Sequence, residues 1–171
     1  MKKKILAGVL VVLVLGVAFL QFASGGILGE AIFNRPGKPK IKHGEFPFQL
    51  VYESDGQQYT VNETIVCDYK GVSFALDGGN TRDWDCYVTN NDRYGRYYLD
   101  EANRPTLYIQ VPLEAEYYMG MPDAKVEYTS PYIFFVDDST GTTHYAEDLM
   151  DVAGVKIISF QIDGLLTDNI K

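Results

Sequence analysis

Histidine is scarce in this chain of 171 residues. Only His43 and His144 are present, so a His-rich metal site cannot be built. The sequence also lacks a serine-nucleophile elbow, a phosphate-binding loop and a zinc-protease helix. There is no Cys-x-x-Cys pair, which argues against a redox role. These absences leave no combination of residues that indicates an enzyme.

Basic side chains are few beyond the first quarter of the chain. Residues 45–171 contain eight basic and 22 acidic residues, which gives this region a net charge of −14. A nucleic-acid-binding domain needs a basic face, so nucleic acid is excluded as a partner. The acidity is typical of a surface that stays soluble and avoids self-association.

One long apolar run is present near the start of the chain. Ile5 to Leu20 is an unbroken stretch of apolar residues and glycine, and as a helix through Phe22 it would span roughly 27 Å, close to the thickness of a bilayer core. Lys2 to Lys4 precede it and favour a cytoplasmic N-terminus. We expect residues 1–23 to be a transmembrane anchor that leaves the rest outside the cell. The alternative is a signal peptide cleaved after Ala23-Ser24-Gly25, which would give a secreted protein.

A tether and a single domain are expected to follow the anchor. Residues 24–44 are rich in glycine, proline and lysine, a composition that disfavours regular structure. The remaining residues, 45–171, are enough for one compact domain. Their high content of tyrosine and phenylalanine favours strands.

A two-residue alternation of apolar side chains begins at Phe46 and predicts a strand with Phe46, Phe48, Leu50 and Tyr52 on one face. Asp55-Gly56 then supplies a strong hairpin signal, because the turn needs positive φ. The return strand places these apolar residues on one face: Tyr59, Val61, Ile65, Cys67 and Tyr69.

Further short strands are separated by clusters of Gly, Asn, Asp and Pro. We expect them at Val72–Leu76, Trp84–Val88, Tyr94–Leu99, Leu107–Val111, Glu116–Met119, Lys125–Tyr128 and Tyr132–Val136. A helix is predicted from Thr142 or Thr143 to Gly154. The last strand is predicted at Val155–Ile162, with Ile158, Phe160 and Ile162 facing inward. The predicted fold is therefore mostly β, an antiparallel sandwich or barrel-like domain with one short C-terminal helix.

Cys67 and Cys86 are the only cysteines, and both fall on predicted inward faces. Two such cysteines in a domain outside the cell usually form a disulfide. The alternative is a pair of separate buried thiols. A disulfide that closes a loop of this length would stabilise the fold by roughly 3 kcal/mol.

The segment from Asp77 to Asp85 is the best candidate for a metal-binding loop. Calcium takes carboxylate and carbonyl oxygens from Gly-containing loops, and the candidate ligands here are Asp77, Asn80, Asp83 and Asp85. Arg82 lies among them and would oppose a cation. A calcium site and a simple solvated loop both remain open.

Asn62-Glu63-Thr64 fits the acceptor pattern for N-glycosylation. Chance matches to so short a pattern are common. The motif matters only if the host glycosylates such sites.

Two tyrosine-rich segments suggest a binding surface. Tyr94, Tyr97 and Tyr98 cluster with two arginines, and Tyr117 and Tyr118 lie in a second apolar segment. Exposed tyrosine and arginine are enriched in protein interfaces, and aromatic rings also stack on sugars. The alternative is that most of these rings belong to the core.

Three short segments carry a resemblance: Lys2-Lys3-Lys4-Ile5, Gly44-Glu45-Phe46-Pro47-Phe48 and the stretch from Gly154 to Phe160. In these segments the chain resembles small exported or membrane-anchored proteins of Gram-positive bacteria. The resemblance implies a location outside the cell and transfers no activity and no site residues.

The sequence as a whole favours a non-enzymatic, extracytoplasmic interaction module that is tethered to the membrane and binds an envelope protein or a wall component. The alternative hypothesis is a calcium-stabilised or glycan-active surface protein. Its glycan-active form would need a pair of carboxylates, which an acidic domain always offers.

Overall fold

The computed structural model describes residues 10–19, 35–75, 79–99, 107–124, 128–137 and 140–170. The chain divides into two compact units, residues 1–37 with 70–83 and residues 38–69 with 84–171. Each unit is described by itself. The larger unit contains the hydrophobic core.

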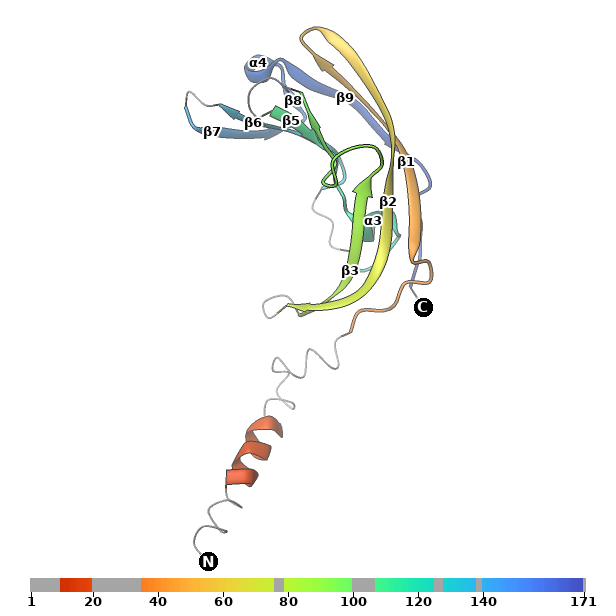
Figure 1. Cartoon of the computed structure of the whole chain (residues 1–171), viewed down its shortest axis with the longest axis vertical. Coiled ribbons are helices and arrows are strands. Elements are labelled where there is room, and N and C mark those ends of the chain that lie inside the picture. Colours follow the sequence, from red (N-terminus) through yellow and green to blue (C-terminus); the bar gives the residue numbers. More distant parts are fainter. Residues whose placement is uncertain are drawn as a thin grey trace, which may run out of the picture. The chain divides into compact units, whose positions relative to one another are not determined.

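In the smaller unit, residues 10–19 form a helix (Figure 1). Its large apolar side chains are all exposed, up to 73% for Phe19. The described residues include no helix with the length and hydrophobicity needed to cross a membrane. The rest of the expected anchor at 1–23, and the tether from 24 to 34, lie outside the described residues. Elsewhere in this unit, the buried Arg82 donates a hydrogen bond from Nε to the carbonyl of Gly37 at 2.9 Å.

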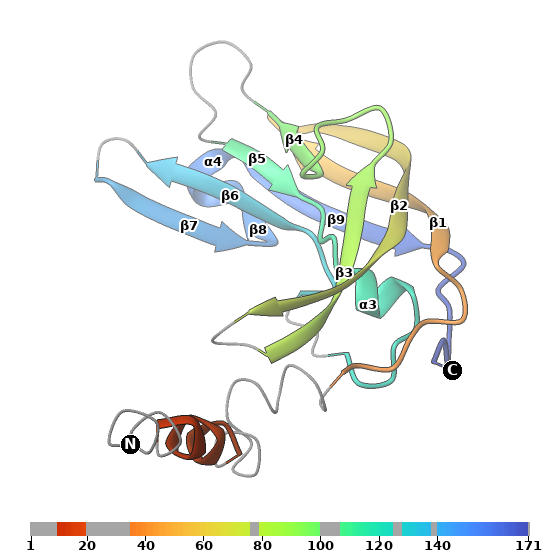
Figure 2. The same cartoon turned by 60° about the horizontal axis from the view of Figure 1, so that its bottom comes forward.

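The described strands pair into two antiparallel sheets (Figures 1 and 2). The five-stranded sheet has the order β3-β2-β1-β9-β8, and the four-stranded sheet has the order β4-β5-β6-β7. The strands are β1 (His43–Ser54), β2 (Gln57–Ala75), β3 (Gly79–Val88), β4 (Arg96–Tyr98), β5 (Leu107–Gln110), β6 (Tyr132–Asp137), β7 (Thr142–Ala146), β8 (Asp148–Leu149) and β9 (Val155–Ile162). Two short helices are α3 (Ala115–Tyr118) and α4 (Met150–Ala153).

The predicted hairpin at Asp55-Gly56 is confirmed. Asp55 and Gly56 have φ of 51° and 73°, the positive values that a tight two-residue turn requires. Ser54 pairs with Gln57, and the register continues without a break to His43 and Asp68.

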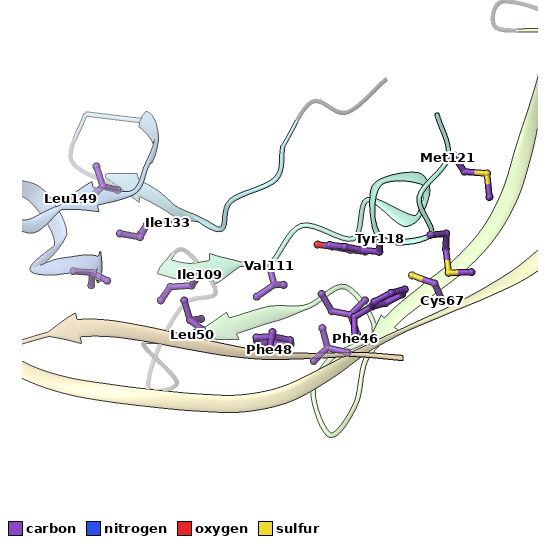
Figure 3. Packing of buried hydrophobic residues seen from close by; sticks show 14 residues of the cluster. Phe46, Phe48, Leu50, Cys67, Ile109, Val111, Tyr118, Met121, Ile133 and Leu149 are labelled. Atoms are coloured by element: carbon purple, nitrogen blue, oxygen red, sulfur yellow. The ribbon is translucent and has the colours of Figure 1, made fainter. Parts of the chain in front are cut away.

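The core of the larger unit lies between the two sheets, which makes the fold sandwich-like (Figure 3). β1 contributes Phe46, Phe48 and Leu50 on the face that the alternation predicted, each at most 4% exposed. The four-stranded sheet contributes Ile109 and Ile133, both fully buried. A mostly β, antiparallel fold is therefore confirmed.

The sequence predicted two strands where the structure has one. β2 continues from Gln57 to Ala75, so the strand expected at Val72–Leu76 is the end of the return strand. Gly71 lies inside it with a φ of 148°. Because glycine tolerates this backbone conformation, it does not interrupt the strand.

Strand β9 has the predicted limits, and Phe160 and Ile162 pack against the core as predicted, but Ile158 does not. A β-bulge shifts its register against β1, because Val51 pairs with Ser159 and Tyr52 pairs with Ile157. Ile158 is the extra residue, and it is 43% exposed instead of facing inward. A bulge changes the side-chain alternation, which period-two reasoning could not detect.

The segment predicted as a strand at Glu116–Met119 is helical instead. α3 spans Ala115–Tyr118, and the amides of Tyr118 and Met119 donate to the carbonyls of Glu114 and Ala115. Alanine and glutamate favour a helix, and this preference prevails over the strand tendency of the paired tyrosines. Residues 125–127 of the strand expected at Lys125–Tyr128 lie outside the described residues, and Tyr128 is not in a strand.

The C-terminal helix is much shorter than predicted. Thr142–Ala146 form strand β7, and only Met150–Ala153 are helical. The predicted end is correct, because Gly154 closes α4 in the left-handed conformation with a φ of 65°. Pairing with β6 prevails over the local helix signals because strand preference depends on cross-strand partners.

The end of the expected tether belongs to the larger unit. Pro39 forms an antiparallel bridge with Ile170. The side chain of Asn169, which is only 2% exposed, accepts from the amide of Ile41 at 2.6 Å and donates to its carbonyl at 2.9 Å. We call residues Pro39–Ile41 and Asn169–Ile170 the terminal clasp.

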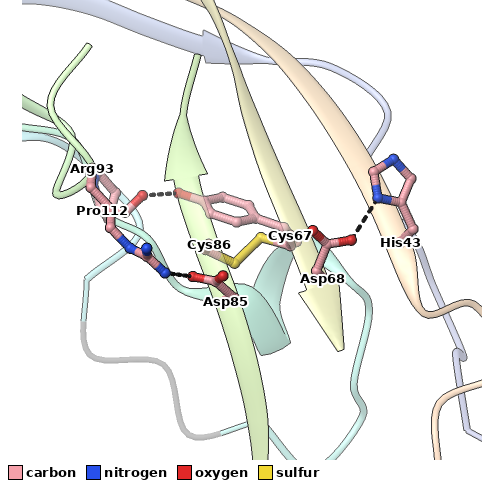
Figure 4. Close-up of a disulfide and its surroundings, with 8 residues drawn as sticks. His43, Cys67, Asp68, Asp85, Cys86, Arg93 and Pro112 are labelled. Carbon is pink, nitrogen blue, oxygen red and sulfur yellow. Dashed lines mark hydrogen bonds and ion pairs between the residues drawn. A yellow bond between two sulfur atoms is a disulfide. The ribbon is translucent and has the colours of Figure 1, made fainter. Parts of the chain in front are cut away.

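Cys67 and Cys86 form a disulfide with Cα atoms 4.2 Å apart, as predicted (Figure 4). The bond joins β2 to β3. Cys67 is fully buried in the core. Beside it in the sheet, the ring of Tyr69 lies against Trp84 at 5.1 Å between centres.

His43 makes the fold sensitive to pH. Its Nδ1 lies 2.8 Å from Asp68 and its Nε2 lies 3.3 Å from Glu45, and these contacts, Asp68 first, raise the pKa of His43 above 6.5. The protonated form therefore stabilises the folded state below that value, and the stabilisation is lost as the pH rises through the raised pKa. We expect the wild-type free energy of unfolding to fall from about pH 6 to about pH 8 relative to His43→Gln. Denaturant titrations at several pH values measure the two slopes, and equal slopes would contradict the expectation.

Candidate functional site

A row of aromatic side chains crosses the whole four-stranded sheet. Tyr98 pairs with Tyr108, Tyr108 with Phe134, and Phe134 with Tyr145, one residue from each strand. Tyr132, two residues before Phe134, shares its face because side chains alternate along a strand. We call these five residues the aromatic face.

The rings of the aromatic face touch one another. Ring centres are 5.6 Å apart for Tyr98 and Tyr108, 4.6 Å for Tyr108 and Phe134, and 5.2 Å for Phe134 and Tyr145. Tyr132 lies 5.9 Å from Tyr145. Cross-strand aromatic pairs stabilise a sheet, so this surface is held in one arrangement before any ligand arrives.

The opposite side of the sheet faces the core. Tyr97, Ile109, Ile133 and Ala146 form the equivalent row there and pack into the hydrophobic cluster. The aromatic face therefore points away from the core. Tyr98 is 38% exposed and Tyr145 is 64% exposed, whereas the other members are half-buried.

Arg96 extends the aromatic face with a positive charge. Its guanidinium carbon lies 5.4 Å from the ring centre of Tyr108 and 4.9 Å from that of Tyr94, within the range of cation–π interactions. A hydrogen bond with Tyr98 raises the pKa of Arg96. Burial raises the pKa of Tyr108 and Tyr132, so their phenols stay neutral near pH 7 and can donate hydrogen bonds.

A groove of about 540 Å³ opens at one end of this surface. Tyr132 and Tyr145 line it together with Glu147 and the segment 128–131. The arrangement offers aromatic edges, hydroxyl groups and one carboxylate.

The structure separates the tyrosines that the sequence grouped as binding residues. Tyr94 and Tyr98 are exposed, at 60% and 38%. Tyr97 and Tyr117 are partly buried against the core. Tyr118 belongs to the core, as the alternative for these rings predicts: it is fully buried, and its hydroxyl donates to the carbonyl of Pro112 at 2.5 Å.

Most of the aromatic face was missed by sequence reasoning. Tyr108 lies in the strand expected at Leu107–Val111, Tyr132 and Phe134 lie in the strand expected at Tyr132–Val136, and Tyr145 lies in the expected helix; none of the four is among the candidate binding residues that the sequence indicates. The alternation Tyr108-x-Gln110 and Tyr132-x-Phe134 places each pair of side chains on one face of its own strand. This pattern could not reveal a shared aromatic surface, because the sequence does not show that the two strands are neighbours.

The proposed calcium loop has a different structure. Asn80, Asp83 and Asp85 lie along β3, and Asp77 is outside the described residues. Asp85 forms an ion pair with Arg93 (Figure 4). Within the part of the chain that the structure describes, no group of three or more His, Cys, Asp or Glu residues could hold a metal ion.

A second hollow lies on the five-stranded sheet. This polar groove has a volume of about 490 Å³. Its amide and carboxylate side chains are Gln49, Asn62, Asn90, Gln161, Glu63 and Asp163. Pro47, Phe48, Thr64 and Thr89 complete the lining.

Comparison with known proteins adds no functional assignment. No protein-family model, curated protein or solved structure matches the chain.

Proposed function

We propose that this protein is a non-enzymatic interaction module, tethered to the membrane outside the cell, which binds an envelope protein through its aromatic face. The observation that carries the proposal is the aromatic row across β4, β5, β6 and β7. Soluble domains rarely expose such a contiguous apolar surface unless it has a partner.

The chemistry of the surface favours a protein as the partner. Tyrosine and arginine are the residue types most enriched at binding hot spots. Tyr108 and Phe134 stack on each other with planes 17° apart. Each of these two rings covers one face of the other, which leaves less ring face open to stack on a sugar.

The tether is proposed from the N-terminal segment. Residues 10–19 are helical and expose all their large apolar side chains to solvent. Exposed apolar surface of this kind is costly in water and favourable in lipid. The lysines at positions 2 to 4 favour a cytoplasmic N-terminus, and the β-rich residues 45–171 would then lie outside.

Truncating the aromatic face should abolish binding without unfolding the domain. In the Tyr98→Ala, Tyr145→Ala double variant, cross-linking to the partner on intact cells should fall by about tenfold or more, because hot-spot residues each contribute about 2 kcal/mol. Quantitative mass spectrometry of the captured proteins from wild-type and variant cells measures the difference and names the partner.

Tyr59→Ala is the matched control. Tyr59 is 42% exposed but lies on β2 in the other sheet, where it stacks on Tyr52. Its replacement should leave the captured proteins unchanged. An identical set of captured proteins from wild type, the double variant and the control would overturn the proposal, provided that the double variant shows wild-type unfolding behaviour.

A further inference from the structure

The polar groove has features that the aromatic face does not share. Three carboxamide side chains stand in register across three neighbouring strands: Asn62 on β2 pairs with Gln49 on β1, which pairs with Gln161 on β9. Directly paired residues on one face lie about 5 Å apart. Gln49 donates to the side-chain oxygen of Asn62 at 3.0 Å, which fixes the orientation of both amides.

A carboxylate at the margin of the groove is also held in place: Glu63 follows Asn62 along β2, so its side chain points to the opposite face of the strand from the amide row. Glu63 accepts a hydrogen bond from the hydroxyl of Thr89 at 3.1 Å and another from the amide of Asn90 at 3.4 Å. The hydroxyl of Thr89 is fixed further by the amide nitrogen of Thr64 at 3.2 Å. Hydrogen bonds between β2 and the segment after β3 therefore fix this margin of the groove.

The charges of the groove select against anions. Glu63 and Asp163 are its charged lining residues, and neither lysine nor arginine is among the described residues that line it. A phosphate, a nucleotide or an acidic polymer would meet only like charge.

The groove also lacks the anchoring pocket that a peptide side chain needs. Its apolar lining residues are Pro47 and Phe48, and Phe48 is 4% exposed because its ring belongs to the core. Peptide and protein ligands depend on buried apolar anchors. Each carboxamide offers one acceptor and two donors, which match the paired hydroxyls of a neutral sugar.

We infer that the polar groove is a binding site for a neutral glycan chain, read by Asn62, Gln49 and Gln161. This site is separate from the aromatic face and does not rest on the protein partner proposed above. A domain with both sites would bind a wall polysaccharide and an envelope protein at the same time. Asn62-Glu63-Thr64, noted in the sequence as a glycosylation pattern, here contributes part of a sugar-binding surface.

The test is a calorimetric titration of the full-length chain, in a zwitterionic detergent without sugar, with the β-1,4-linked tetramer of N-acetylglucosamine. Saturable binding is expected. The Gln49→Leu, Gln161→Leu double variant should bind roughly tenfold to a hundredfold more weakly, because each lost hydrogen bond removes about 1 kcal/mol.

The controls separate the outcomes. Gln58→Leu, an exposed glutamine on β2 outside the groove, should bind as wild type does, and so should the Tyr98→Ala, Tyr145→Ala variant. Tetragalacturonic acid, which is anionic, should bind much more weakly than the neutral tetramer. No binding of the neutral tetramer, stronger binding of the anionic one, or equal affinity in the Gln49→Leu, Gln161→Leu variant would each overturn the inference. So would competition by a neutral polar peptide at equal concentration.

Discussion

Gly120→Ala should destabilise the larger unit by about 3 kcal/mol or more, or prevent its folding. Gly120 has a φ of 65°, and a Cβ atom there would overlap the carbonyl of Leu166 and lie 2.6 Å from the amide nitrogen of Thr167. Both neighbours are backbone atoms. They cannot move aside, because the amide of Leu166 donates to the carbonyl of Tyr118 and the amide of Asn169 donates to that of Gly120. Denaturant unfolding of the full-length chain measures the loss.

Gly141→Ala is the control that separates the two costs of Gly120→Ala, the steric overlap of the new Cβ atom and the strain of a left-handed backbone. Gly141 has nearly the same φ, 67°, but a Cβ atom there would meet nothing within 4 Å. Its replacement should cost only the strain of a left-handed alanine, about 1 kcal/mol. If the two variants lose the same stability, close packing of the C-terminal segment on Gly120 is not what holds this region together.

Removing the disulfide should have the second large effect. The Cys67→Ala, Cys86→Ala variant should lose roughly 3 kcal/mol of unfolding free energy, because a loop spanning 19 positions is no longer closed in the unfolded chain. Cys67 is fully buried, so loss of its sulfur adds a packing cost. Unfolding curves of the variant and of the oxidised wild type give the total loss.

Chemical reduction of the wild type separates the stability lost with the disulfide bond from the stability lost with the packing of the sulfur atoms. The reduced protein keeps both sulfur atoms and loses only the bond, so its stability should fall between those of the oxidised protein and the variant. The variant itself should not respond to reductant. Equal stability of the oxidised and reduced wild type would show that the bond contributes nothing to the fold.

Local signals were sufficient for some elements and not for others. The turn at Asp55-Gly56, the limits of β9, and the pairing of Cys67 with Cys86 follow from short-range rules of backbone conformation, alternation and burial. The exposure of Ile158 does not, because the bulge arises from the register between two strands a hundred residues apart in sequence. The change of residues 142–146 from expected helix to strand has the same origin, since β6 provides their hydrogen-bond partners.

The residues of the candidate sites also divide into those that a short stretch of sequence indicates and those that only strand pairing brings together. Tyr98 is a candidate that the sequence alone indicates, because it lies in a compact cluster of aromatic and basic residues. Tyr108, Phe134 and Tyr145 come together only when four strands align. The amide row of the polar groove likewise joins residues 49, 62 and 161, whose common position depends on the sheet order. Burial of Tyr118 required the helical turn of α3, which the paired tyrosines did not suggest.

The terminal clasp has a mechanical consequence. A pull on the chain before Pro39 reaches the larger unit first at the terminal clasp, through the Pro39–Ile170 bridge and the hydrogen bonds of Lys40 and Ile41 with Asn169, and then at β1. β1 lies in the middle of its sheet with β2 on one side and β9 on the other. Extracting it would break its ladder with β2 from His43 onward and, from Phe48 onward, its ladder with β9 as well. The load therefore enters at a central strand of the five-stranded sheet, which is held on both sides.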